Sequence, residues 1–410
     1  MWVTFLVIFM RFSGLFEGAE LWFFDNMMRL QPTGVPDNRL LVIEVTQEDI
    51  KAQGKEPRQD SSLTNKNLLE ILKKLVDNPK NKPKAIGLDI YRDFENENRE
   101  LSKIMSEKDN SIFAICNIGD PSQKNKGVEP PDNFSQERLG FSDFFTDQDR
   151  IVRRQVLKMA NDQKPCRTKT GKQPVIHSLS LQLARHYFKD RIYKDPLDGK
   201  NSYLQIGNTV IESLFAEYRG GYSMRTDLRG YQILLKYRKP CLDRVCSLEN
   251  IAPKVTVTEF LKDDFFQNYN DLKNRIVLIG VTDNSREKPW DTPFSSGGHP
   301  IPGVIIHAQM VSQILRAVED KEALLGVWSI WHEILWIFAW SLVGGTLAQR
   351  CRTINSLTMF GGIAFLSLSV ICFIIFIFPN VWIPFVPSAL SFLSTGGVVL
   401  FIRLKPQKSS

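Results

Sequence analysis

The chain has 410 residues, and its 43% hydrophobic and 24% charged residues exclude a disordered or collagen-like protein. The formal net charge is +7, but residues 25–323 hold 46 basic against 42 acidic side chains, so this large region is nearly neutral. A nearly neutral surface without a basic stripe argues against nucleic acid as a partner.

An apolar segment opens the chain. Ten apolar residues precede Arg11, fewer than the roughly 17 to 25 that a membrane span needs. If Arg11 extends toward the membrane surface, the apolar segment continues to Phe16, and residues 1–24 form a short N-terminal membrane segment. No basic start or small-residue cleavage site indicates a signal peptide. The short span also favours a true start upstream of Met1.

Strands and helices alternate in the region that follows. Continuous apolar runs at 40–45 (LLVIEV), 85–91, 111–118 and 275–281 are typical of strands that are buried on both faces. Apolar residues at helical spacing predict connecting helices, and the β, α, β, α, β order favours a parallel sheet. The helices are expected at 61–78, 97–108, 178–188 and 303–318, and further strands at 152–159 and 231–237. The sequence therefore predicts an α/β domain over 25–323, with a mostly parallel central sheet and flanking helices.

Three long apolar stretches close the chain, at 324–348, 354–378 and 381–402. Each is long enough to cross a hydrocarbon core about 30 Å thick at 1.5 Å per residue. The chain is therefore predicted to be a membrane protein with an all-α transmembrane block and a short tail at 403–410.

Basic residues predict the orientation of this block. Arg350 and Arg352 follow the first long stretch and Arg403 follows the last, whereas the turn at 379–380 carries no charge. Positive loops stay on the cytoplasmic side, so residues 25–323 are expected outside the cytoplasm.

Four cysteines of the domain would then face an oxidising compartment. Cys241 and Cys246 are close enough in sequence to form a small-loop disulfide, or they remain free thiols. Cys116 and Cys166 likewise either pair with one another or stay reduced.

Several segments in order resemble one family, the type-2 CHASE (CHASE2) domain, an extracellular sensory module of bacterial cyclases and kinases. They run from ELWFFDNMMRLQP through LLVIEVTQEDI, AIGLDI, GFSDFFTDQDRIVRR and SLSLQLA to RIVLIGVTDNSREKPWDTPF and PGVIIHAQMVSQIL. The segment WHEILWIFAWSLVGGTLA is also similar to the family, particularly to its cyanobacterial members.

The resemblance implies an N-terminal span, an extracytoplasmic sensor, three further spans and a cytoplasmic output domain. Only eight residues follow Ile402, so the output is expected from a separately encoded kinase or cyclase. A homodimer in the bacterial inner (plasma) membrane is expected, with the large domain in the periplasm; a thylakoid membrane is the other location that we consider. The family implies no general ligand. Around Gly54 the family's aromatic-rich turn is replaced by GKEPRQ.

Two ligand-binding candidates follow predicted strands. Asp89 ends one strand and Asp291 follows another, and parallel sheets bind ligands beyond the carboxyl ends of their strands. The alternatives are that Asp89 caps a helix or pairs with Arg92, and that Asp291 orders its own loop.

Three further residues are weaker candidates by type and position. Asp147 and Arg153 in DQDRIVRR are expected to form a charged rim that binds an anion or an acidic partner. The alternative is that they belong to a turn followed by a solvated strand face. His307 falls near the start of its predicted helix, where the dipole disfavours its protonated form, so it is either a neutral hydrogen-bonded residue or a pH switch.

Catalytic and metal motifs are missing from the sequence. The chain has no G-x-S-x-G, H-E-x-x-H or G-x-G-x-x-G motif, and its five histidines lack metal-ligand spacing. We therefore expect neither an enzyme nor a cofactor or metal site.

Each long apolar stretch contains a pair of glycines near its cytoplasmic end, and small residues let membrane helices approach closely. The pairs are Gly344 and Gly345, Gly361 and Gly362, and Gly396 and Gly397. One hypothesis is that they share one tightly packed layer; the other is that glycine is simply common in membrane helices. Glu333 is expected in a wet aromatic belt at the membrane surface.

Together these features predict a membrane-anchored sensor that binds a small molecule or a protein and passes the signal through four helices in contact with lipid. A structural protein that uses the domain as a docking surface is the alternative, and a fragment of a longer receptor is a third interpretation.

Overall fold

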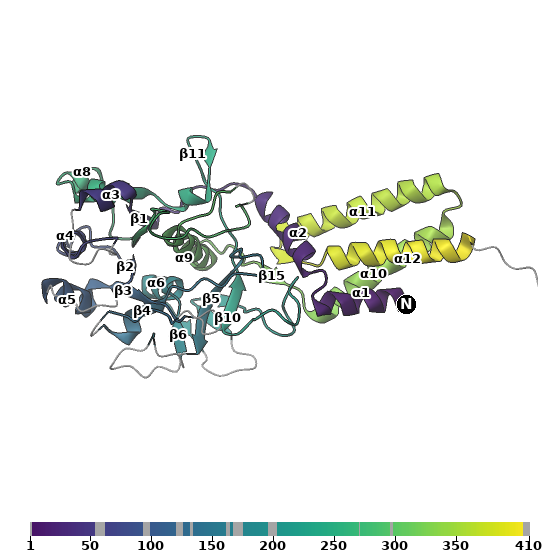
Figure 1. Cartoon of the computed structure of the whole chain (residues 1–410), viewed down its shortest axis with the longest axis horizontal. Coiled ribbons are helices and arrows are strands. Elements are labelled where there is room, and N and C mark those ends of the chain that lie inside the picture. The colour runs from purple at the N-terminus through teal and green to yellow at the C-terminus, as the bar shows by residue number, and fades with distance from the viewer. Residues whose placement is uncertain are drawn as a thin grey trace, which may run out of the picture. The chain divides into compact units, whose positions relative to one another are not determined.

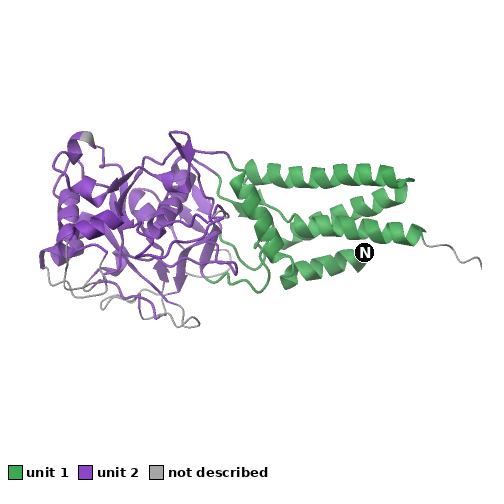
Figure 2. Ribbon diagram, turned by 45° about the horizontal axis from the view of Figure 1, so that its top comes forward, with its two compact units in different colours: residues 1–31, 213–229, 323–410 green, residues 32–212, 230–322 purple. Residues whose placement is uncertain are grey.

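The computed structural model describes residues 2–53, 62–92, 99–119, 126–131, 134–160, 165–166, 175–195, 203–269, 271–295 and 298–404. They form two compact units (Figure 2). The sheet unit comprises residues 32–212 and 230–322, and the helical unit comprises residues 1–31, 213–229 and 323–410. The GKEPRQ turn near Gly54 and the tail 405–410 lie outside the described residues.

The sheet unit is built on one six-stranded parallel sheet, which confirms the predicted α/β class (Figure 1). The strand order is β13-β1-β14-β2-β3-β4, and Ile43 of β1 lies opposite Ile279 of β14. Every neighbouring pair in this order is parallel. The strands are β1 (Leu40–Val45), β2 (Ala85–Asp89), β3 (Ile112–Cys116), β4 (Leu139–Phe141), β13 (Lys254–Thr256) and β14 (Ile276–Val281).

Helices cover both faces of this sheet. Alternate strand residues such as Ile43 and Leu88 share a fully apolar core with the helices on one face. On the other face, Gly87 and Gly280 leave room for Leu183 and Val304. The first face is covered by α4 (Asn65–Val76), α5 (Arg99–Ser106) and α7 (Val257–Leu261), and the second by α6 (Leu179–Tyr187) and α9 (Gly303–Glu319); α3 (Gln47–Ala52) and α8 (Phe265–Asn268) are shorter.

Smaller sheets complete the sheet unit. The predicted strands at 152–159 and 231–237 do not join the central sheet but pair antiparallel as β5 and β10. These sheets are β10-β5-β6, β7-β8-β9 and the hairpin β11-β12, with β5 (Arg154–Ala160), β6 (Val175–His177), β7 (Tyr193–Lys194), β8 (Leu204–Ile206), β9 (Thr209–Ile211), β10 (Tyr231–Leu234), β11 (Cys241–Leu242) and β12 (Val245–Cys246). Short 3-10 turns lie at Lys108–Asn110, Gln136–Arg138 and Leu248–Ile251.

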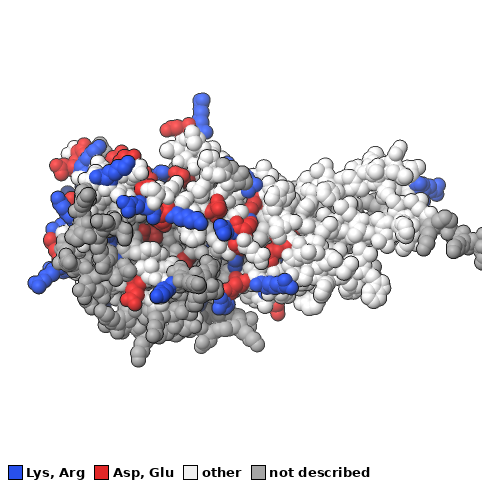
Figure 3. All heavy atoms as spheres, in the orientation of Figure 1, with Lys and Arg blue, Asp and Glu red and all other residues white. Residues whose placement is uncertain are grey.

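The helical unit contains three helices that are long and apolar enough to cross a membrane: α10 (Ile330–Arg350), α11 (Ile354–Ile377) and α12 (Val386–Leu404). Two of the helices begin later than the apolar stretches predict. The reason is that β15 (Gly326–Val327) and β16 (Val381–Trp382) pair as short parallel strands just before α10 and α12. In the view of Figure 3 these helices show almost no charged side chains, whereas the sheet unit carries both signs.

The N-terminal segment is not one straight span. It consists of α1 (Trp2–Ser13) and α2 (Glu17–Arg29), which are bent by 79° at a short break, so it is a broken span or a re-entrant pair. The expectation that Arg11 extends to the membrane surface is wrong, because its side chain is only 1% exposed within the helical unit. Arg11 instead lies 3.3 Å from Glu333 and donates to the carbonyl oxygens of Gly220 and Tyr222.

Glu333 is therefore not a wet residue of a surface belt. It lies in the first turn of α10, and its side chain is fully buried beside Arg11. A second carboxylate, that of Glu20, accepts from the backbone N–H groups of Phe385 and Val386 at 2.9 and 2.8 Å and so caps α12.

A segment from the middle of the sequence belongs to the helical unit. Residues 213–229 lie between β9 and β10 in the chain, yet they form one compact unit with the membrane helices. Glu17 accepts from the backbone N–H of Ser223 at 3.0 Å and from the hydroxyl of Thr226 at 2.9 Å. The backbone N–H of Ile330 donates to the carbonyl of Glu217 at 2.9 Å. The segment thus bonds to α2 and to the start of α10.

The six glycines of the membrane helices do not form one layer in this chain. A Cβ built on Gly344 would lie 2.1 Å from the carbonyl oxygen of Phe392, and one on Gly396 would lie 3.3 Å from the carbonyl oxygen of Gly344. These two glycines mark a close crossing of α10 and α12. Among the described residues no atom lies within 4 Å of a Cβ on Gly361, Gly362 or Gly397, and Gly345 makes only ordinary contacts. The three-helix layer is therefore wrong, because α11 does not share this crossing.

Candidate ligand-binding site

Asp89 ends strand β2 at the carboxyl edge of the parallel sheet. The four residues before it, Ala85–Leu88, are buried apolar residues or glycine, and the strand pairs with β14 up to Gly280. The side chain of Asp89 is itself buried, at 5% exposure. The structure thus places this carboxylate where the sequence analysis expects a ligand-binding crevice.

His307 is the nearest partner of Asp89. It lies in the second turn of α9, and its Nε2 is 3.6 Å from Asp89 Oδ1, beyond hydrogen-bond distance. Among the described residues, neither ring nitrogen of His307 has a hydrogen-bond partner, and neither has Asp89 Oδ2. The prediction that His307 is a hydrogen-bonded residue is therefore wrong. Arg92, the alternative partner of Asp89, instead donates to the carbonyl of Leu63 and to Asn65.

Glu287 contributes a second carboxylate from the loop between β14 and α9. The loop turns here because the backbone N–H groups of Arg286 and Glu287 donate to the carbonyl of Asp283. A Cβ built on Gly303 would lie 2.7 Å from Glu287 Oε1 and 3.8 Å from Asp89 Oδ2. Gly303, the first residue of α9, therefore gives both carboxylates room beside the helix N-terminus.

Burial controls the protonation of these three groups. Desolvation raises the pKa of Asp89 to about 7, and desolvation followed by the charge of Asp89 raises the pKa of Glu287 to about 8. Desolvation lowers the pKa of His307 to about 3. His307 is therefore neutral at physiological pH. The pKa values of the two carboxyl groups lie close to physiological pH.

Aromatic rings form one wall of the cluster. The rings of Phe144 and His307 have their centroids 4.6 Å apart, and Phe144 lies 5.1 Å from Trp290 in an edge-on contact. Trp290 and Ile301 exchange backbone hydrogen bonds of 2.8 Å, which close the part of the β14–α9 loop that follows Glu287. These contacts bring the loop after β4 and the loop after β14 to the same edge of the sheet.

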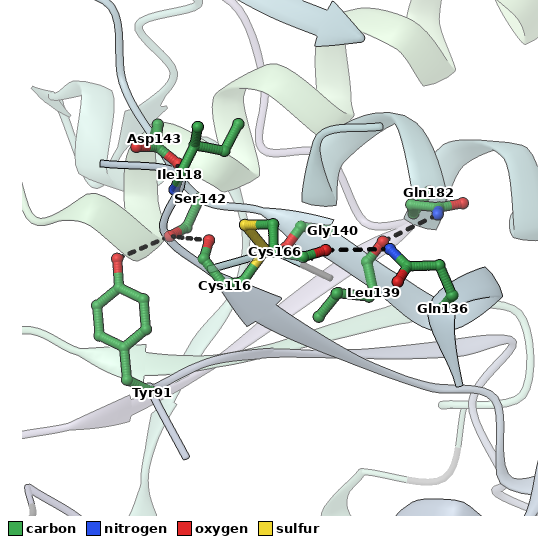
Figure 4. The surroundings of a disulfide bond; sticks show 10 residues. All are labelled: Tyr91, Cys116, Ile118, Gln136, Leu139, Gly140, Ser142, Asp143, Cys166 and Gln182. Carbon is green, nitrogen blue, oxygen red and sulfur yellow. Dashed lines mark hydrogen bonds between the residues drawn. A yellow bond between two sulfur atoms is a disulfide. The ribbon is translucent and has the colours of Figure 1, made fainter. Parts of the chain in front are cut away.

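Polar groups that follow β2, β3 and β4 bond to one another near Asp89, and Figure 4 shows them around the Cys116–Cys166 disulfide. Tyr91 bonds to Ser142 at 2.8 Å, and Asp143 accepts from the backbone N–H of Ile118 at 2.8 Å. Burial raises the pKa of Asp143 to about 6, and burial together with the charges of Asp89 and Asp143 raises the pKa of Tyr91.

A disulfide between Cys116 and Cys166 joins the end of β3 to a segment 50 residues later (Figure 4). A second disulfide joins Cys241 and Cys246, which lie opposite one another across the β11–β12 hairpin. Both pairings are among those that the sequence analysis leaves open. Cys351 and Cys372 are free.

Asp147 and Arg153 do not belong to the Asp89 cluster. Arg153 bonds to Asp147 at 2.8 Å and to Asp149 at 2.6 Å, and Arg154 also bonds to Asp147. Asp147 and Arg153 are buried, so they form neither an exposed rim nor a solvated strand face. They neutralise one another, which is why a charged sequence here becomes part of the interior.

Asp291 acts mainly through its backbone. Its carbonyl accepts from the N–H of Val152 at 2.9 Å, while its side chain is exposed. Of the five predicted ligand-binding residues, Asp89 and His307 meet at the carboxyl edge of the sheet, whereas Asp147 and Arg153 pair with one another outside this cluster. Glu287, Phe144 and Trp290 were missed because they lie in irregular loops, where no periodicity singles them out. Their position in the loops that follow strands β4 and β14 is the signal that could have identified them.

The donor set of the cluster does not suggest a metal site. Among the described residues no group of three or more His, Cys, Asp or Glu side chains is arranged to hold a metal ion. What the cluster offers is two carboxylates without a basic partner, a neutral imidazole and two aromatic rings.

Residues 3–346 match the model of the CHASE2 domain. Comparison with curated proteins and with solved structures finds no match.

Proposed function

The chain belongs to the CHASE2 domain family, and from this premise we propose that it is a membrane-anchored sensor that binds its ligand at the carboxyl edge of the sheet. CHASE2 is a sensory domain rather than a catalytic one. In this proposal the sheet unit lies outside the cytoplasm, and the helical unit carries the signal across the membrane.

The convergence of Asp89, Glu287 and His307 is the observation that supports ligand binding. Buried polar groups are normally hydrogen-bonded, and leaving them without partners is costly. Three such atoms, Asp89 Oδ2 and the two ring nitrogens of His307, have no partner within the part of the chain that the structure describes. They meet where parallel sheets bind ligands, so a bound molecule is the natural partner.

Chain connectivity supports transmission of the signal. The chain passes from β9 of the sheet unit into residues 213–229 of the helical unit and returns to β10. Those residues bond to Arg11 of α1 and to Glu17 of α2. A ligand that binds the Asp89 site more tightly in one arrangement of the sheet unit would bias α1 and α2 if that arrangement also moved β9 and β10. It can shift this equilibrium only by its differential affinity for the two arrangements.

The membrane orientation and the output complete the proposal. Arg350, Arg352 and Arg403 gather at the ends of α10 and α12, and Arg403 donates to the carbonyl of Cys351 at 2.6 Å. Positive-inside orientation places these ends in the cytoplasm of a bacterial cell, with the sheet unit in the periplasm. We propose a homodimer that regulates a kinase or cyclase there.

A docking role is the second candidate function, because one exposed apolar feature favours it. The β11–β12 hairpin is closed by a disulfide, and its Leu242 and Val245 are 55% and 66% exposed. Such a fixed apolar hairpin suits contact with another protein better than with a small ligand.

In-cell photo-crosslinking separates the two functions. The crosslinking amino acid replaces Arg352 or Leu404, both at the proposed cytoplasmic end, and captured proteins are identified by mass spectrometry. Capture of a kinase or cyclase is expected from these positions but not from Leu242. Capture from Leu242 alone, or self-crosslinks alone across several growth conditions, would contradict signalling and favour docking.

A further inference from the structure

The charges around Asp89 and Glu287 point to the chemistry of the missing partner. Other buried carboxylates of the sheet unit are satisfied by the protein: Asp37 pairs with Arg39 at 2.8 Å, and Asp49 accepts from Thr46 and Thr258. Among the described residues no lysine or arginine pairs with Asp89 or Glu287. This cluster therefore holds two acidic groups and no basic side chain.

The α9 N-terminus offsets only part of this acidity. Helix α9 has no side-chain cap at Pro302, and Glu287 Oε1 lies over Gly303, its first residue. A helix N-terminus carries about half a positive charge, enough to favour one nearby carboxylate. Asp89 faces the neutral ring of His307 instead, so its negative charge has no compensation.

His307 gives an independent indication that something binds here. Its side chain is 3% exposed and comes from a different element than either carboxylate, yet no described residue bonds to either ring nitrogen. A neutral imidazole has one acceptor nitrogen and one donor N–H. Asp89 Oδ2 is an acceptor in the same place, so the cluster presents at least two acceptors that need a donor.

We propose that Asp89, Glu287 and His307 bind the protonated primary amino group of a small organic molecule, with its carbon skeleton against Phe144 and Trp290. This inference rests on the proposed sensor function and names its ligand class. A primary ammonium ion has three N–H donors and one positive charge, which match the unpaired acceptors and the uncompensated carboxylate. The aromatic rings favour a cation with an apolar body.

Two other cations fit the cluster less well. A divalent metal ion needs several oxygen or nitrogen ligands at close distance, and the described residues show no such group. A quaternary ammonium ion has no N–H group, so Asp89 Oδ2 and the acceptor nitrogen of His307 would remain unpaired.

Thermal unfolding of the full-length protein in detergent tests the proposal. The probes are ethylammonium, tetramethylammonium and calcium chloride, each compared with sodium chloride at the same ionic strength. Ethylammonium is expected to raise the unfolding temperature in a saturable manner, and the other two are not. Its apparent affinity should fall at least about tenfold in Glu287→Gln and in Asp89→Asn, the loss of one charged hydrogen bond. Asp291→Asn, an exposed acid of the same loop, is the matched control and should keep full affinity.

The pH dependence gives a second readout that does not depend on how the variants fold. Ammonium binding requires ionised carboxylates, so affinity in the unmodified protein should be higher at pH 8 than at pH 6, with protons released on binding. The proposal would be overturned if ethylammonium did not raise the unfolding temperature, or if it raised it equally in the unmodified protein and in both site variants. A rise with calcium alone would also overturn it. The capture of a cytoplasmic kinase or cyclase is measured without any ligand, so its outcome judges the sensor function separately.

Discussion

Arg11 of α1 and Glu333 of α10, which are 322 residues apart in the chain, form an ion pair of 3.3 Å in which both side chains are fully buried. The same guanidinium donates to the carbonyl oxygens of Gly220 and Tyr222. One side chain therefore joins the N-terminal helix, the first long membrane helix and the segment 213–229. We regard Arg11 as the point where these three elements meet.

Arg11→Gln should destabilise the helical unit strongly. Removing one partner of a buried ion pair leaves the other uncompensated and typically costs about 3–5 kcal/mol. The double variant Arg11→Gln/Glu333→Gln should recover part of this loss, because no buried charge is left alone. Thermal unfolding of the full chain in detergent measures both variants; a double variant that is no more stable than Arg11→Gln would show that the pair itself contributes little.

Asp89→Asn should stabilise the ligand-free protein at high pH. Because the folded-state pKa is about 7 and the unfolded value about 3.9, the native state holds a proton that the unfolded state has lost. Stability therefore falls as pH rises from about 4 to 7, and the neutral amide avoids this loss. The gain should reach about 2–4 kcal/mol at pH 8 and vanish near pH 4.

The comparison of Asp89→Asn with the unmodified protein isolates the contribution of the Asp89 carboxyl group to the pH dependence of stability. Asp143 and His307 face position 89 in both proteins, so their own titrations largely cancel. The charge of Asp89 also raises the pKa of Glu287, so its removal in the variant lowers that pKa and adds to the gain at high pH. His307 alone gives the opposite trend below pH 6.5, since its folded-state pKa is about 3. Unfolding curves at pH 4, 6 and 8 would contradict the assignment if the variant were equally stable or less stable at pH 8.

Gly344→Ala should disrupt the helical unit, whereas Gly361→Ala should not. The added methyl group on Gly344 would lie 2.1 Å from a backbone carbonyl of α12, and backbone cannot move aside as a side chain can. Gly361 has open space in this chain, so it is the matched control. Retained yield and unfolding temperature in detergent are the measurements, and equal losses in both variants would contradict the α10–α12 crossing.

The two disulfides should contribute unequally to stability. The loop between Cys116 and Cys166 is ten times longer than that between Cys241 and Cys246, with separations of 50 and 5 residues. Chain-entropy arguments assign about 4 kcal/mol to the longer loop and about 2 kcal/mol to the shorter. Paired Cys→Ser variants, compared by thermal unfolding, should follow this order; the reverse order would contradict it.

The sequence predicted the parallel sheet well because its strands are continuous apolar runs. The same reasoning placed Asp89 at a strand end, and the structure has it there. It could not show that His307 meets Asp89, because that contact depends on how α9 packs against β14, the neighbour of β2. Glu287 could not be predicted as a site residue, because its loop has no periodic sequence pattern.

Charged residues were the main source of error. Arg11, Glu333 and Arg153 were expected at surfaces, since an isolated charge is rarely buried. Each is buried because a partner of opposite charge neutralises it. For Arg11 and Glu333 the partner is distant in the sequence, and for Arg153 it is Asp147 in a nearby turn. Pairing of this kind depends on tertiary structure and leaves no local pattern in the sequence.

The central claim is that occupation of the Asp89 site changes the cytoplasmic end of the helical unit. Cys351 offers a natural reporter, because it is a partly exposed free thiol in the loop after α10. The other free thiol, Cys372, is buried and is replaced by serine in all the proteins compared.

Glu287→Lys supplies the site with a fixed ammonium group, and Asp291→Lys makes the same charge change on an exposed side chain of the same loop. The most direct measurement is the rate at which a maleimide modifies Cys351 in the full chain in lipid nanodiscs. The account predicts a rate change of about fivefold or more in Glu287→Lys, the usual size of allosteric coupling, and none in Asp291→Lys. Equal rates in both variants and in the parent protein would contradict coupling between the site and the membrane helices.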